Sequence, residues 1–412
     1  MATFNQSYDL LVSVDVGYNA SKVDVNGITF EIPSDIVDIT GNDTYIGGIR
    51  KPGYIASTYV EGAKHLIGEQ ARMLMSEPEY KDRMGHMETV LNSYDKFTTQ
   101  DSESHLLTTI AVALIKYSEY TKENHIQPEF DVTTPVTKDS QWKIWVILGF
   151  PHDKYESIFK AIRKSIVGRH AFTVERDIDT YDLDFELLPS RVFPYSQALA
   201  VFMGLISNDN GEILDDSPYL EKLPCVVVDG GQKTMGIYKI TSNNQIEMAE
   251  SNTKFAMNNV FERVVERIHK EYGRTDISVS NINDILKQGG NLVYIKSGSD
   301  QTDSVDNNEI EKEEKEKVCN ELIDYLNEKF SQFLDIKSFE IAGGTGSAFF
   351  PQIKEYIDTH KAHLKDTTEL VQYKYLGKQI EPQYAIAVGL YKVLRHIVNL
   401  KSQKNGNEGA NK

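Results

Sequence analysis

The sequence predicts an α/β fold in which one structural unit occurs twice, and three observations support this. The chain has 412 residues, which suggests two or three domains at roughly 150 residues each. Patterns typical of strands and helices alternate along its whole length. A strand, an Asp, a Gly turn and a second strand occur as VSVDVGYNASKVDV from Val12 and again as VVVDGGQKTMGIYKI from Val226. Two such segments about half a chain apart indicate an internal duplication.

Composition narrows the class of protein. Apolar residues make up 40% and charged residues 25% of the chain, as in soluble globular proteins. The formal net charge is -17, and no dense Lys/Arg run occurs, so direct binding of nucleic acid is not expected. No apolar run reaches the roughly 20 residues of a membrane span. Met1 to Asp9 lack a signal-peptide core, and Cys225 and Cys319 form no CxxC or Cys/His cluster. A cytoplasmic protein without a disulfide framework or zinc site is therefore expected.

The first half is expected to contain mainly strands. Strands are predicted at residues 10–16, 21–25, 27–32 and 142–150, with a hairpin at 59–70 that turns at Gly62. Helices are predicted at 104–117, where apolar residues form a helical stripe, and at 153–167. Residues 189–203 are predicted to be a strand end, a break at Pro194 and a helix.

The second half alternates more regularly. Strands are predicted at residues 224–229, 237–240 and 339–342. Helices are predicted at 255–272, 309–333 and 383–399, and the acidic start of the second suits the positive end of a helix dipole. Residues 297–308 are expected to form a surface loop, and the polar, Gly/Asn-rich residues 400–412 a disordered tail.

The first strand leads into a turn, Asp15-Val16-Gly17-Tyr18-Asn19, that suits phosphate binding. Backbone N–H groups in such a turn have no strand partner and can donate to phosphate oxygens. Phosphate repels a carboxylate, so Asp15 is expected to hold the waters of Mg²⁺, which keeps several waters in proteins. Lys22 would neutralise phosphate charge. Taken alone, the segment also fits an ordinary hairpin turn.

The second loop is Asp229-Gly230-Gly231-Gln232-Lys233-Thr234. Asp-Gly between apolar strands is a strong hairpin signal, and a phosphate-binding loop of this kind is itself a hairpin. Two such loops in corresponding halves favour a single nucleoside triphosphate bound between the halves. Asp229 would then hold metal-bound water as Asp15 does.

A third glycine-rich segment, Gly343-Gly344-Thr345-Gly346, stands between a strand and a helix. Glycines let a backbone approach a ligand closely, and a helix N-terminus favours anions. The segment lacks the Walker spacing and a full GxGxxG, so by itself it also fits a plain strand–helix turn.

With three loops in this order, the chain resembles the actin, sugar-kinase and heat-shock-ATPase superfamily, and within it the ParM-type actin-like proteins of bacterial plasmid segregation. The similarity extends over most of the chain. Besides the three loops, the segments that carry it are Ile32-Pro33-Ser34, residues 59–71, Leu148-Gly149-Phe150-Pro151 with Tyr155, Gln383-Tyr384-Ala385, and Gly389-Leu390-Tyr391.

The resemblance implies an actin-like fold with two lobes around a nucleotide cleft. Lobe I would comprise residues 1–203, completed by the helix at 383–399, and lobe II residues 204–382. The implied activity is slow hydrolysis of ATP or GTP with Mg²⁺, coupled to head-to-tail polymerisation. A DNA-binding adaptor protein would connect the filament to plasmid DNA, without direct nucleic-acid or membrane contact.

The resemblance also assigns roles to individual residues. Asp15 and Asp229 would hold the metal through water, and Gln197 is the candidate for orienting the attacking water. The residues expected to bind the nucleotide are Gly17, Tyr18, Asn19, Lys22, Gly230, Gly231, Gln232, Lys233, Thr234, Gly343, Gly344, Thr345 and Gly346.

The chain departs from the family pattern at two positions. The family has Gln or Glu where Tyr195 stands in Val192-Phe193-Pro194-Tyr195-Ser196-Gln197, so Gln197 lies two positions beyond the expected place. The second loop of the family continues Thr-x-Asp, whereas here Gly236 takes the place of that Asp.

Three alternatives remain open from the sequence. The first is a small-molecule kinase of the same superfamily, although no general-base Asp facing a sugar pocket is apparent. The second is a chaperone-like nucleotide switch, although little chain follows the last nucleotide motif. The third is a nucleotide-binding scaffold without turnover, which Tyr195 leaves open.

Overall fold

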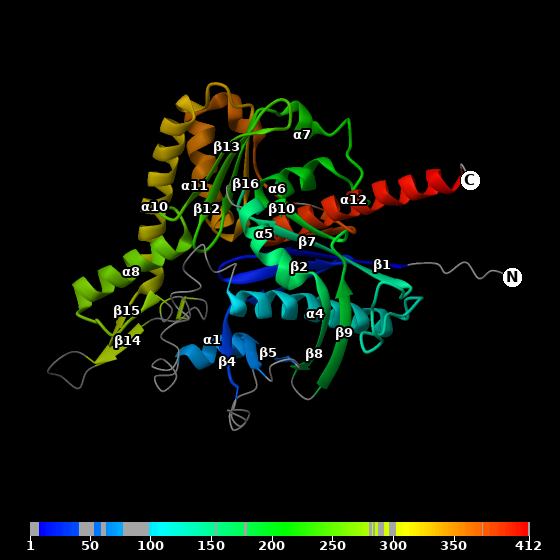
Figure 1. Cartoon of the computed structure of the whole chain (residues 1–412). Helices are drawn as coiled ribbons and strands as arrows, with labels where there is room; N and C mark the ends of the chain where they lie inside the picture. Colours follow the sequence, from blue (N-terminus) through cyan, green and yellow to red (C-terminus); the bar gives the residue numbers. More distant parts are fainter. Residues whose placement is uncertain are drawn as a thin grey trace. The chain divides into compact units, whose positions relative to one another are not determined.

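The computed structural model describes residues 8–40, 53–58, 63–76, 99–152, 155–176, 179–279, 282, 285–286, 292–295, 302–372 and 374–410. The chain forms two compact units (Figure 1). Unit 1 comprises Met1–Ser217 and Gln372–Lys412, and unit 2 comprises Pro218–Val371. The boundaries thus differ from the predicted lobe boundaries at residues 203 and 382.

Unit 1 is built on a five-stranded sheet with the order β10-β7-β1-β2-β3. The strands β1, β7 and β10 are parallel, and β2 and β3 continue the sheet antiparallel. Apolar residues of the central strand β1 are buried on both faces of the sheet, as its continuous apolar sequence predicts. The bounds are β1 (Tyr8–Asp15), β2 (Ala20–Val25), β3 (Ile28–Pro33), β7 (Trp142–Phe150) and β10 (Val192–Ser196).

A second five-stranded sheet in unit 1 has the order β4-β6-β5-β8-β9, and its neighbouring strands are antiparallel. Its strands are β4 (Ile36–Asp38), β5 (Gly53–Thr58), β6 (Lys64–Gly68), β8 (Gly168–Arg176) and β9 (Asp179–Leu187). Of the predicted hairpin at 59–70, residues 64–68 form β6, which pairs antiparallel with β5. Residues 59–62, with the predicted turn at Gly62, lie outside the described residues, and residues 69–70 already belong to a helix, α1 (Glu69–Ser76).

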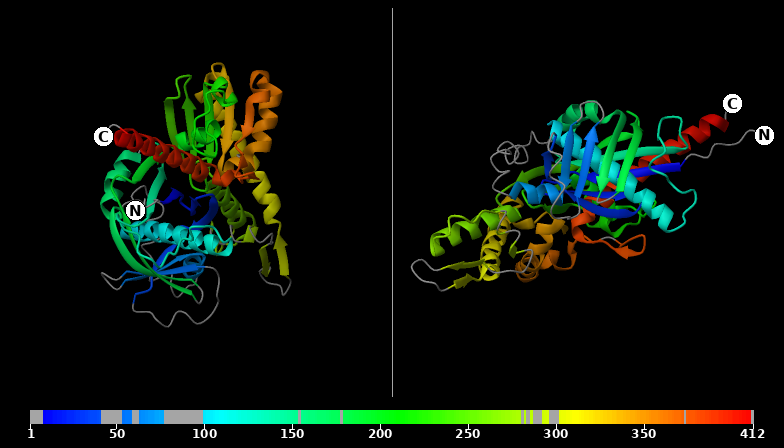
Figure 2. Two further views of the ribbon diagram at one scale, coloured as in Figure 1. Left: turned by 90° about the vertical axis from the view of Figure 1, so that its right-hand side faces the viewer. Right: turned by 90° about the horizontal axis from the view of Figure 1, so that it is seen from below.

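Helices fill the space between and beside these sheets. Helix α4 (Gln100–Glu123) contacts strands of both sheets and lies between them (Figure 1 and Figure 2). Thr99 caps its N-terminus by accepting from the Ser102 N–H. Helices α6 (Gln197–Ile206) and α12 (Ala385–Ala410) pack on each other, and α12 contacts β1, β2 and β7. The remaining elements of unit 1 are α5 (Tyr155–Ile166), β18 (Lys374–Tyr375), β19 (Lys378–Gln379) and the 3₁₀ turn η5 (Pro382–Tyr384).

Unit 2 contains a five-stranded sheet with the order β13-β12-β11-β16-β17. One hydrophobic cluster joins a face of this sheet to the helices α8, α10 and α11. The bounds are β11 (Cys225–Gly230), β12 (Met235–Ile240), β13 (Ile246–Asn252), β16 (Ser338–Ala342), β17 (Thr368–Leu370), α8 (Met257–Tyr272), α10 (Asn307–Lys329) and α11 (Gly343–His360). Smaller elements are α7 (Pro218–Glu221), β14 (Leu292–Ile295), β15 (Thr302–Val305), η3 (Ser331–Phe333) and η4 (Ala362–Thr367).

The two sheets that contain β1 and β11 have the same topology. In each, a strand that ends at or next to an Asp pairs antiparallel with the next strand of the chain, which in turn pairs antiparallel with the one after it, in the orders β1-β2-β3 and β11-β12-β13. On its other side two strands are parallel to it, in the order β1-β7-β10 and β11-β16-β17. Asp15 and Asp229 occupy equivalent positions, opposite Gly149 and Ala342. The predicted duplication is therefore confirmed.

Several predicted element boundaries were wrong. Residues 302–305, expected in a loop, form β15. The helix predicted at 309–333 ends at Lys329, because residues 331–333 adopt positive φ angles that an α-helix does not allow. The final helix continues to Ala410 instead of ending at residue 399. Lys401 there donates to the Ser190 carbonyl at 2.7 Å and lies 4.8 Å from the ring of Phe193, contacts that favour helix beyond residue 399.

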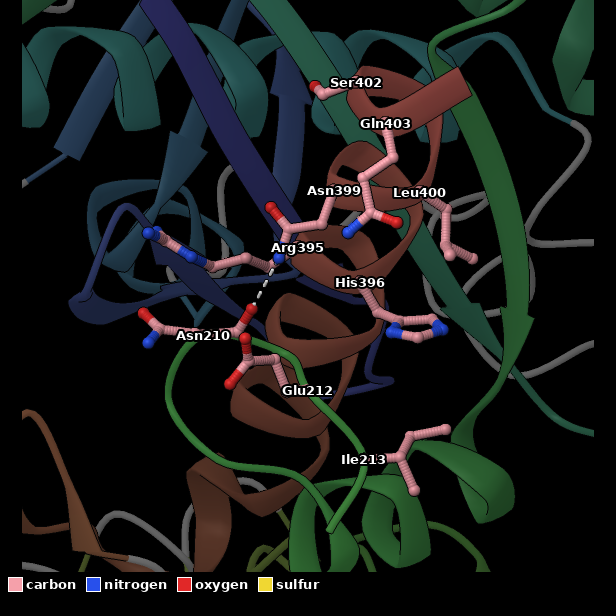
Figure 3. Close-up of a pocket in the computed structure, with 9 residues that line it drawn as sticks. All are labelled: Asn210, Glu212, Ile213, Arg395, His396, Asn399, Leu400, Ser402 and Gln403. Atoms are coloured by element: carbon pink, nitrogen blue, oxygen red, sulfur yellow. Dashed lines mark hydrogen bonds between the residues drawn. The ribbon is translucent and has the colours of Figure 1, made fainter. Parts of the chain in front are cut away.

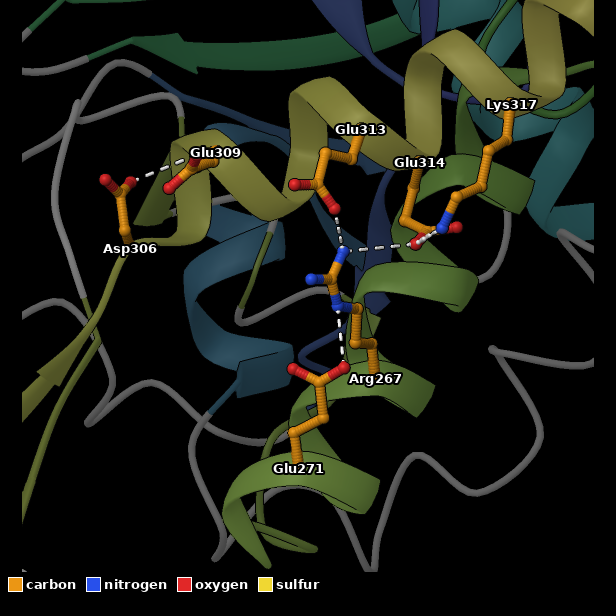
Figure 4. Close-up of polar contacts among 7 residues, drawn as sticks. All are labelled: Arg267, Glu271, Asp306, Glu309, Glu313, Glu314 and Lys317. Carbon is orange, nitrogen blue, oxygen red and sulfur yellow. Dashed lines mark hydrogen bonds and ion pairs between the residues drawn. The ribbon is translucent and has the colours of Figure 1, made fainter.

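The acidic start of α10 is partly paired with α8. Arg267 of α8 forms ion pairs with Glu313 and Glu314 of α10 and, at 2.9 Å, with Glu271 of its own helix (Figure 4). Asp306 caps α10 by accepting from the Glu309 N–H. Partly exposed ion pairs contribute little stability each, so the cluster mainly sets how the two helices align.

A carboxyl group is buried beneath α12 on the first sheet of unit 1. Asp24 is fully buried, and its Oδ1 accepts from the Gly27 N–H at 2.8 Å. Burial raises the pKa of Asp24 from 3.8 to about 7, with Tyr375 and Tyr391 as its polar neighbours. The native state therefore retains a proton that the unfolded chain releases near pH 4. As a result, the contribution of Asp24 to the free energy of unfolding falls as pH rises from about 4 to about 7.

Asp24→Asn is accordingly expected to gain stability relative to the unmodified protein as pH rises through that window. The difference between a pKa of 3.8 and one of about 7 sets an upper limit of roughly 4 kcal/mol on this gain. Urea unfolding of both proteins between pH 4.5 and 8.5 measures the difference. Glu340 of unit 2 also has its pKa raised to about 7 by burial, so the difference curve is the informative quantity. A difference that does not vary with pH would contradict the prediction.

Candidate functional site

The first loop follows β1 in unit 1. Asp15 ends the strand with 3% of its surface exposed, and the Gly17 N–H donates to the Asp15 carbonyl at 3.0 Å. A Cβ at Gly17 would lie 2.3 Å from the Ala20 carbonyl oxygen, so the turn has no room for a side chain there. Tyr18 and Asn19 complete the turn before β2.

Lys22 lies beside this turn. It is paired with Asp15 across β1 and β2, so the two side chains are on the same face of the sheet. Lys22 Nζ is 3.5 Å from the position that a Cβ of Gly17 would occupy. The structure thus brings together an acidic group, a basic group and the turn, which are the groups that the sequence assigns to this loop.

Gln197 contacts Asp15 although 182 residues separate them in the chain. It is the first residue of α6, immediately after β10, and its Nε2 donates to Asp15 Oδ1 at 2.7 Å. Gly149 belongs to β7, which lies between β1 and β10 in the sheet. A Cβ at Gly149 would be 3.4 Å from Gln197 Cγ and 2.7 Å from a methyl group of Leu390. The absence of a side chain at Gly149 therefore leaves space for this contact.

Tyr195 occupies the position at which the family pattern has Gln or Glu. It lies in β10 opposite Gly149, and burial, with a smaller effect of Tyr155, raises its pKa to about 12. A tyrosine with so high a pKa remains protonated at neutral pH. Gln197 is the amide residue of this segment that contacts Asp15.

Two residues that support the first loop received no role from the sequence. Ser34 Oγ donates to the Gly17 carbonyl at 2.9 Å, and Arg72 donates to both the carbonyl and the side-chain oxygen of Asn19 at 3.1 Å. Arg72 also forms an ion pair with Asp35 at 2.7 Å. Ser34 could be noticed as part of the Ile32-Pro33-Ser34 motif, whereas no local pattern indicates Arg72 because it lies 53 residues from Asn19.

The second loop connects β11 and β12 in unit 2. Its turn is closed by the Gly231 N–H, which donates to the Thr234 carbonyl at 2.9 Å. The Gln232 carbonyl accepts from the Asn258 N–H in the first turn of α8 at 2.7 Å, and Lys233 lies at the tip. The loop is therefore a hairpin, as its Asp-Gly sequence predicts.

The third segment packs directly against the second loop. Thr345 Oγ1 donates to the Gly231 carbonyl at 2.8 Å. A Cβ at Gly230 would lie 2.1 Å from the Gly346 nitrogen, so these two backbones are in direct contact. Gly343 has a φ of 78°, and a Cβ there would lie 2.7 Å from Asp229 Oδ1. The structure thus unites segments that are more than 110 residues apart, as the 114-residue separation of Thr345 and Gly231 shows.

The third segment is the first turn of α11 and not a loop before it, which corrects the sequence-based expectation. Helix α11 begins directly where β16 ends, and no side chain of the described residues caps its N-terminus. Gly344 has open space around its Cβ position. A helix N-terminus at the carboxyl ends of parallel strands is a favourable place for an anion.

The second departure from the family pattern has a physical explanation. Gly236 is paired with Asp229 across β11 and β12. A Cβ at Gly236 would lie 2.4 Å from the hydroxyl oxygen of Tyr238 and 2.7 Å from the nearest atom of its ring. The phenol ring of Tyr238 thus occupies the space that an aspartate side chain at residue 236 would need.

Neither loop by itself forms a protein cage for a metal. The described residues contain no group of three or more His, Cys, Asp or Glu side chains that could hold a metal ion. Cys225 and Cys319 are buried free thiols. None of the described helices has the length and apolar sequence required to cross a membrane.

Comparison with known proteins identifies the fold. Neither a protein-family model nor a curated protein matches the sequence. Among solved structures, the actin-like protein Alp7A matches with a TM-score of 0.67 over 98% of this chain and 100% of its own, at 14% identity. The fold is actin-like.

Two further structures have this actin-like fold. The ParM protein of a 15-stranded filament from Clostridium botulinum matches with a TM-score of 0.63 and 14% identity, over 94% of this chain and 99% of its own. An archaeal actin homologue in complex with ADP matches with a TM-score of 0.58 and 16% identity, over 94% of this chain and 99% of its own. The actin-like fold predicted from the resemblance is therefore confirmed across nearly the whole chain.

Proposed function

We propose that this protein is an actin-like filament-forming protein that binds and hydrolyses ATP or GTP and segregates plasmid DNA through an adaptor. The observation that carries the proposal is the equivalent placement of Asp15 and Asp229, each beside a glycine turn at the end of the first strand of a duplicated sheet. The likeness to Alp7A and to ParM from a filament supports self-association. Units 1 and 2 would correspond to the two lobes.

The phosphate-binding groups would be backbone N–H groups of both loops and the N-terminus of α11. In the first loop these would come from Tyr18 and Asn19, while Gly17, whose N–H donates to the Asp15 carbonyl, would leave room for the phosphates and Lys22 would supply positive charge. In the second they would come from residues 232–234, while Gly230 and Gly231 form the hairpin that presents them. The close contact between Gly230 and Gly346 would fix that loop against the N-terminus of α11, whose first turn contains Gly343, Gly344 and Thr345.

The residues present suit Mg²⁺ held through water. Mg²⁺ favours oxygen ligands, and proteins commonly hold it with one or two carboxylates while phosphates and waters complete its shell. Asp15 and Asp229 provide such carboxylates, and the described residues offer no larger acidic cage. Bound Mg²⁺ would neutralise phosphate charge.

Gln197 would position the attacking water. Its Nε2 donates to Asp15 Oδ1, which fixes the orientation of the amide and makes Oε1 the acceptor for a water proton. A residue of this kind orients water for in-line attack in other nucleotide hydrolases. Asp15 would thereby act both on the metal's water and, through Gln197, on the nucleophile.

Gln197→Ala is expected to lower phosphate release by about 100-fold and to change nucleotide affinity much less, because the amide acts on water and not on the nucleotide. Release of phosphate and binding of a fluorescent nucleotide measure the two effects separately. Gln141→Ala, at an exposed glutamine of the same unit, is the matched control. Unchanged phosphate release in Gln197→Ala would remove the role assigned to this residue.

Sedimentation and light scattering with ATP, GTP or no nucleotide, in parallel with phosphate release, test the proposed function. Nucleotide-dependent pelleting together with phosphate release is the expected result. Phosphate release that requires an added sugar, without pelleting, would indicate a small-molecule kinase instead. Pelleting without release would indicate a scaffold.

The connection to DNA would be indirect. The formal charge of -17 disfavours contact with a phosphate backbone, so an adaptor protein would carry the DNA. The protein would act in the cytoplasm. Filaments that bind plasmid DNA in the absence of any other protein would contradict this part of the proposal.

A further inference from the structure

In unit 2, a turn with unusual backbone angles is followed directly by an exposed leucine, Leu334. Ser331, Gln332 and Phe333 have φ angles of 47°, 62° and 62°. Residues other than glycine rarely adopt this left-handed conformation. Phe333 is buried and packs against Phe330 and Phe339 with ring centroids 6.1 and 5.6 Å apart. Leu334 follows directly and is 80% exposed, the largest value among the exposed large apolar side chains of the described residues.

The surroundings of Leu334 are basic. Lys361 donates to Gln332 Oε1 at 2.7 Å and lies 5.8 Å from the ring of Phe333. Lys337 is exposed three residues after Leu334. The neighbouring acid, Asp335, forms an ion pair with Lys239 at 2.6 Å. Strained backbone persists where the surrounding structure enforces it and often marks a functional site, so this leucine is a candidate contact residue.

Unit 1 contains a pocket between α12 and the loop before α7, and this pocket is large enough to accept an apolar side chain. Its volume is about 560 Å³, within the range of roughly 300–1,000 Å³ that accommodates small ligands and ample for one leucine side chain. Asn399 Nδ2 donates to the Asn210 carbonyl, and His396 is within 2.9 Å of the Gly211 carbonyl, so the loop is fixed to the helix. The lining residues are Asn210, Glu212, Ile213, Arg395, His396, Asn399, Leu400, Ser402 and Gln403 (Figure 3).

The apolar part of this pocket is exposed, and its loop is acidic. Ile213 and Leu400 are 42% and 45% exposed. Arg395 and His396 also line the pocket, but Arg395 donates to the Tyr391 hydroxyl and His396 is engaged with the loop backbone. The loop itself contributes four carboxylates, at Asp209, Glu212, Asp215 and Asp216.

We propose that Leu334 of one copy inserts into the pocket lined by Ile213 and Leu400 of the next copy. An exposed apolar side chain with basic surroundings then meets a pocket that offers two apolar side chains beside an acidic loop, so the charges of the two surfaces are complementary. The contact joins two different surfaces, and repetition of such a heterologous contact generates an open filament unless the rotation closes a ring. The inference rests on the proposed function and specifies one contact of the filament.

Cross-linking tests the contact directly. Leu334→Cys and Leu400→Cys are made as separate proteins, and the two natural cysteines are buried. Mixing the two proteins with ATP or GTP and a short thiol cross-linker should give a dimer that contains one copy of each. Leu376→Cys, at another exposed leucine (58%), replaces Leu334→Cys in the control mixture. Dimer yield no higher than in this control would overturn the proposal.

Polymerisation provides the second readout. Leu334→Glu should raise the critical concentration for pelleting by about 10- to 100-fold, the factor that corresponds to loss of one buried leucine. Leu334→Met should pellet normally, and both variants should bind nucleotide as the unmodified protein does. Normal pelleting of Leu334→Glu would overturn the contact and leave the proposed function intact. Failure of the unmodified protein to pellet would overturn the proposed function, and the cross-linking result would then decide the contact on its own.

Discussion

Asp229→Ala is expected to reduce phosphate release at least 100-fold, because it removes a carboxylate assigned to hold metal-bound water beside the phosphates. The same change should remove most of the effect of Mg²⁺ on nucleotide affinity. Binding of a fluorescent nucleotide measured with Mg²⁺ and with a chelator separates the metal from the nucleotide itself. In the unmodified protein the two affinities should differ, and in the variant they should be nearly equal.

The matched control is Asp324→Ala, at an exposed aspartate of α10 in the same unit. It should leave release, affinity and thermal stability unchanged. Asp15→Ala should act in the same direction as Asp229→Ala, since the two residues occupy equivalent positions in the duplicated sheets. Undiminished phosphate release in Asp229→Ala would refute the role of this residue.

The second large effect is expected for Gly230→Ala. The added Cβ would lie 2.1 Å from the Gly346 nitrogen and 2.8 Å from the Thr345 carbonyl carbon, both backbone atoms that cannot rotate away. The second loop and the start of α11 must therefore separate. A stability loss of about 1–3 kcal/mol and loss of nucleotide binding should follow, measured by urea unfolding and nucleotide titration.

Gly344→Ala provides a control within the same glycine-rich segment. A Cβ at Gly344 meets no atom within 4 Å, and alanine is favoured over glycine in a helix, so this variant should be at least as stable as the unmodified protein. The prediction for Gly230 fails if both substitutions have the same effect on stability.

Local sequence was sufficient to place the two aspartates. Each ends an apolar strand before a glycine turn, and strand period and turn chemistry both act over a few residues. The same argument located β1, β7, β11 and β16 and the amphipathic helix α8. The duplication was visible because the two copies retain a similar local pattern around Val12 and Val226.

Contacts between distant segments could not be predicted in this way. Gln197 reaches Asp15 because β7 and β10 lie parallel to β1 and because Gly149 has no side chain. Arg72 donates to Asn19 from helix α1, which follows strand β6 of the other sheet of unit 1. The left-handed turn at residues 331–333 was missed because none of its residues is a glycine, which is the usual signal for positive φ.

The division of unit 1 between the two ends of the chain has a consequence for biosynthesis. The face of its first sheet that α12 covers includes Ser13, whose hydroxyl donates to the Ala387 carbonyl at 2.8 Å. A ribosome working at roughly 5–20 residues per second produces all of unit 2 before it produces α12. Unit 2 therefore has the opportunity to fold first, while β1, β2 and β7 keep the face that α12 covers exposed until α12 has been synthesised. A chaperone that binds nascent chains would be expected to protect that face during the interval.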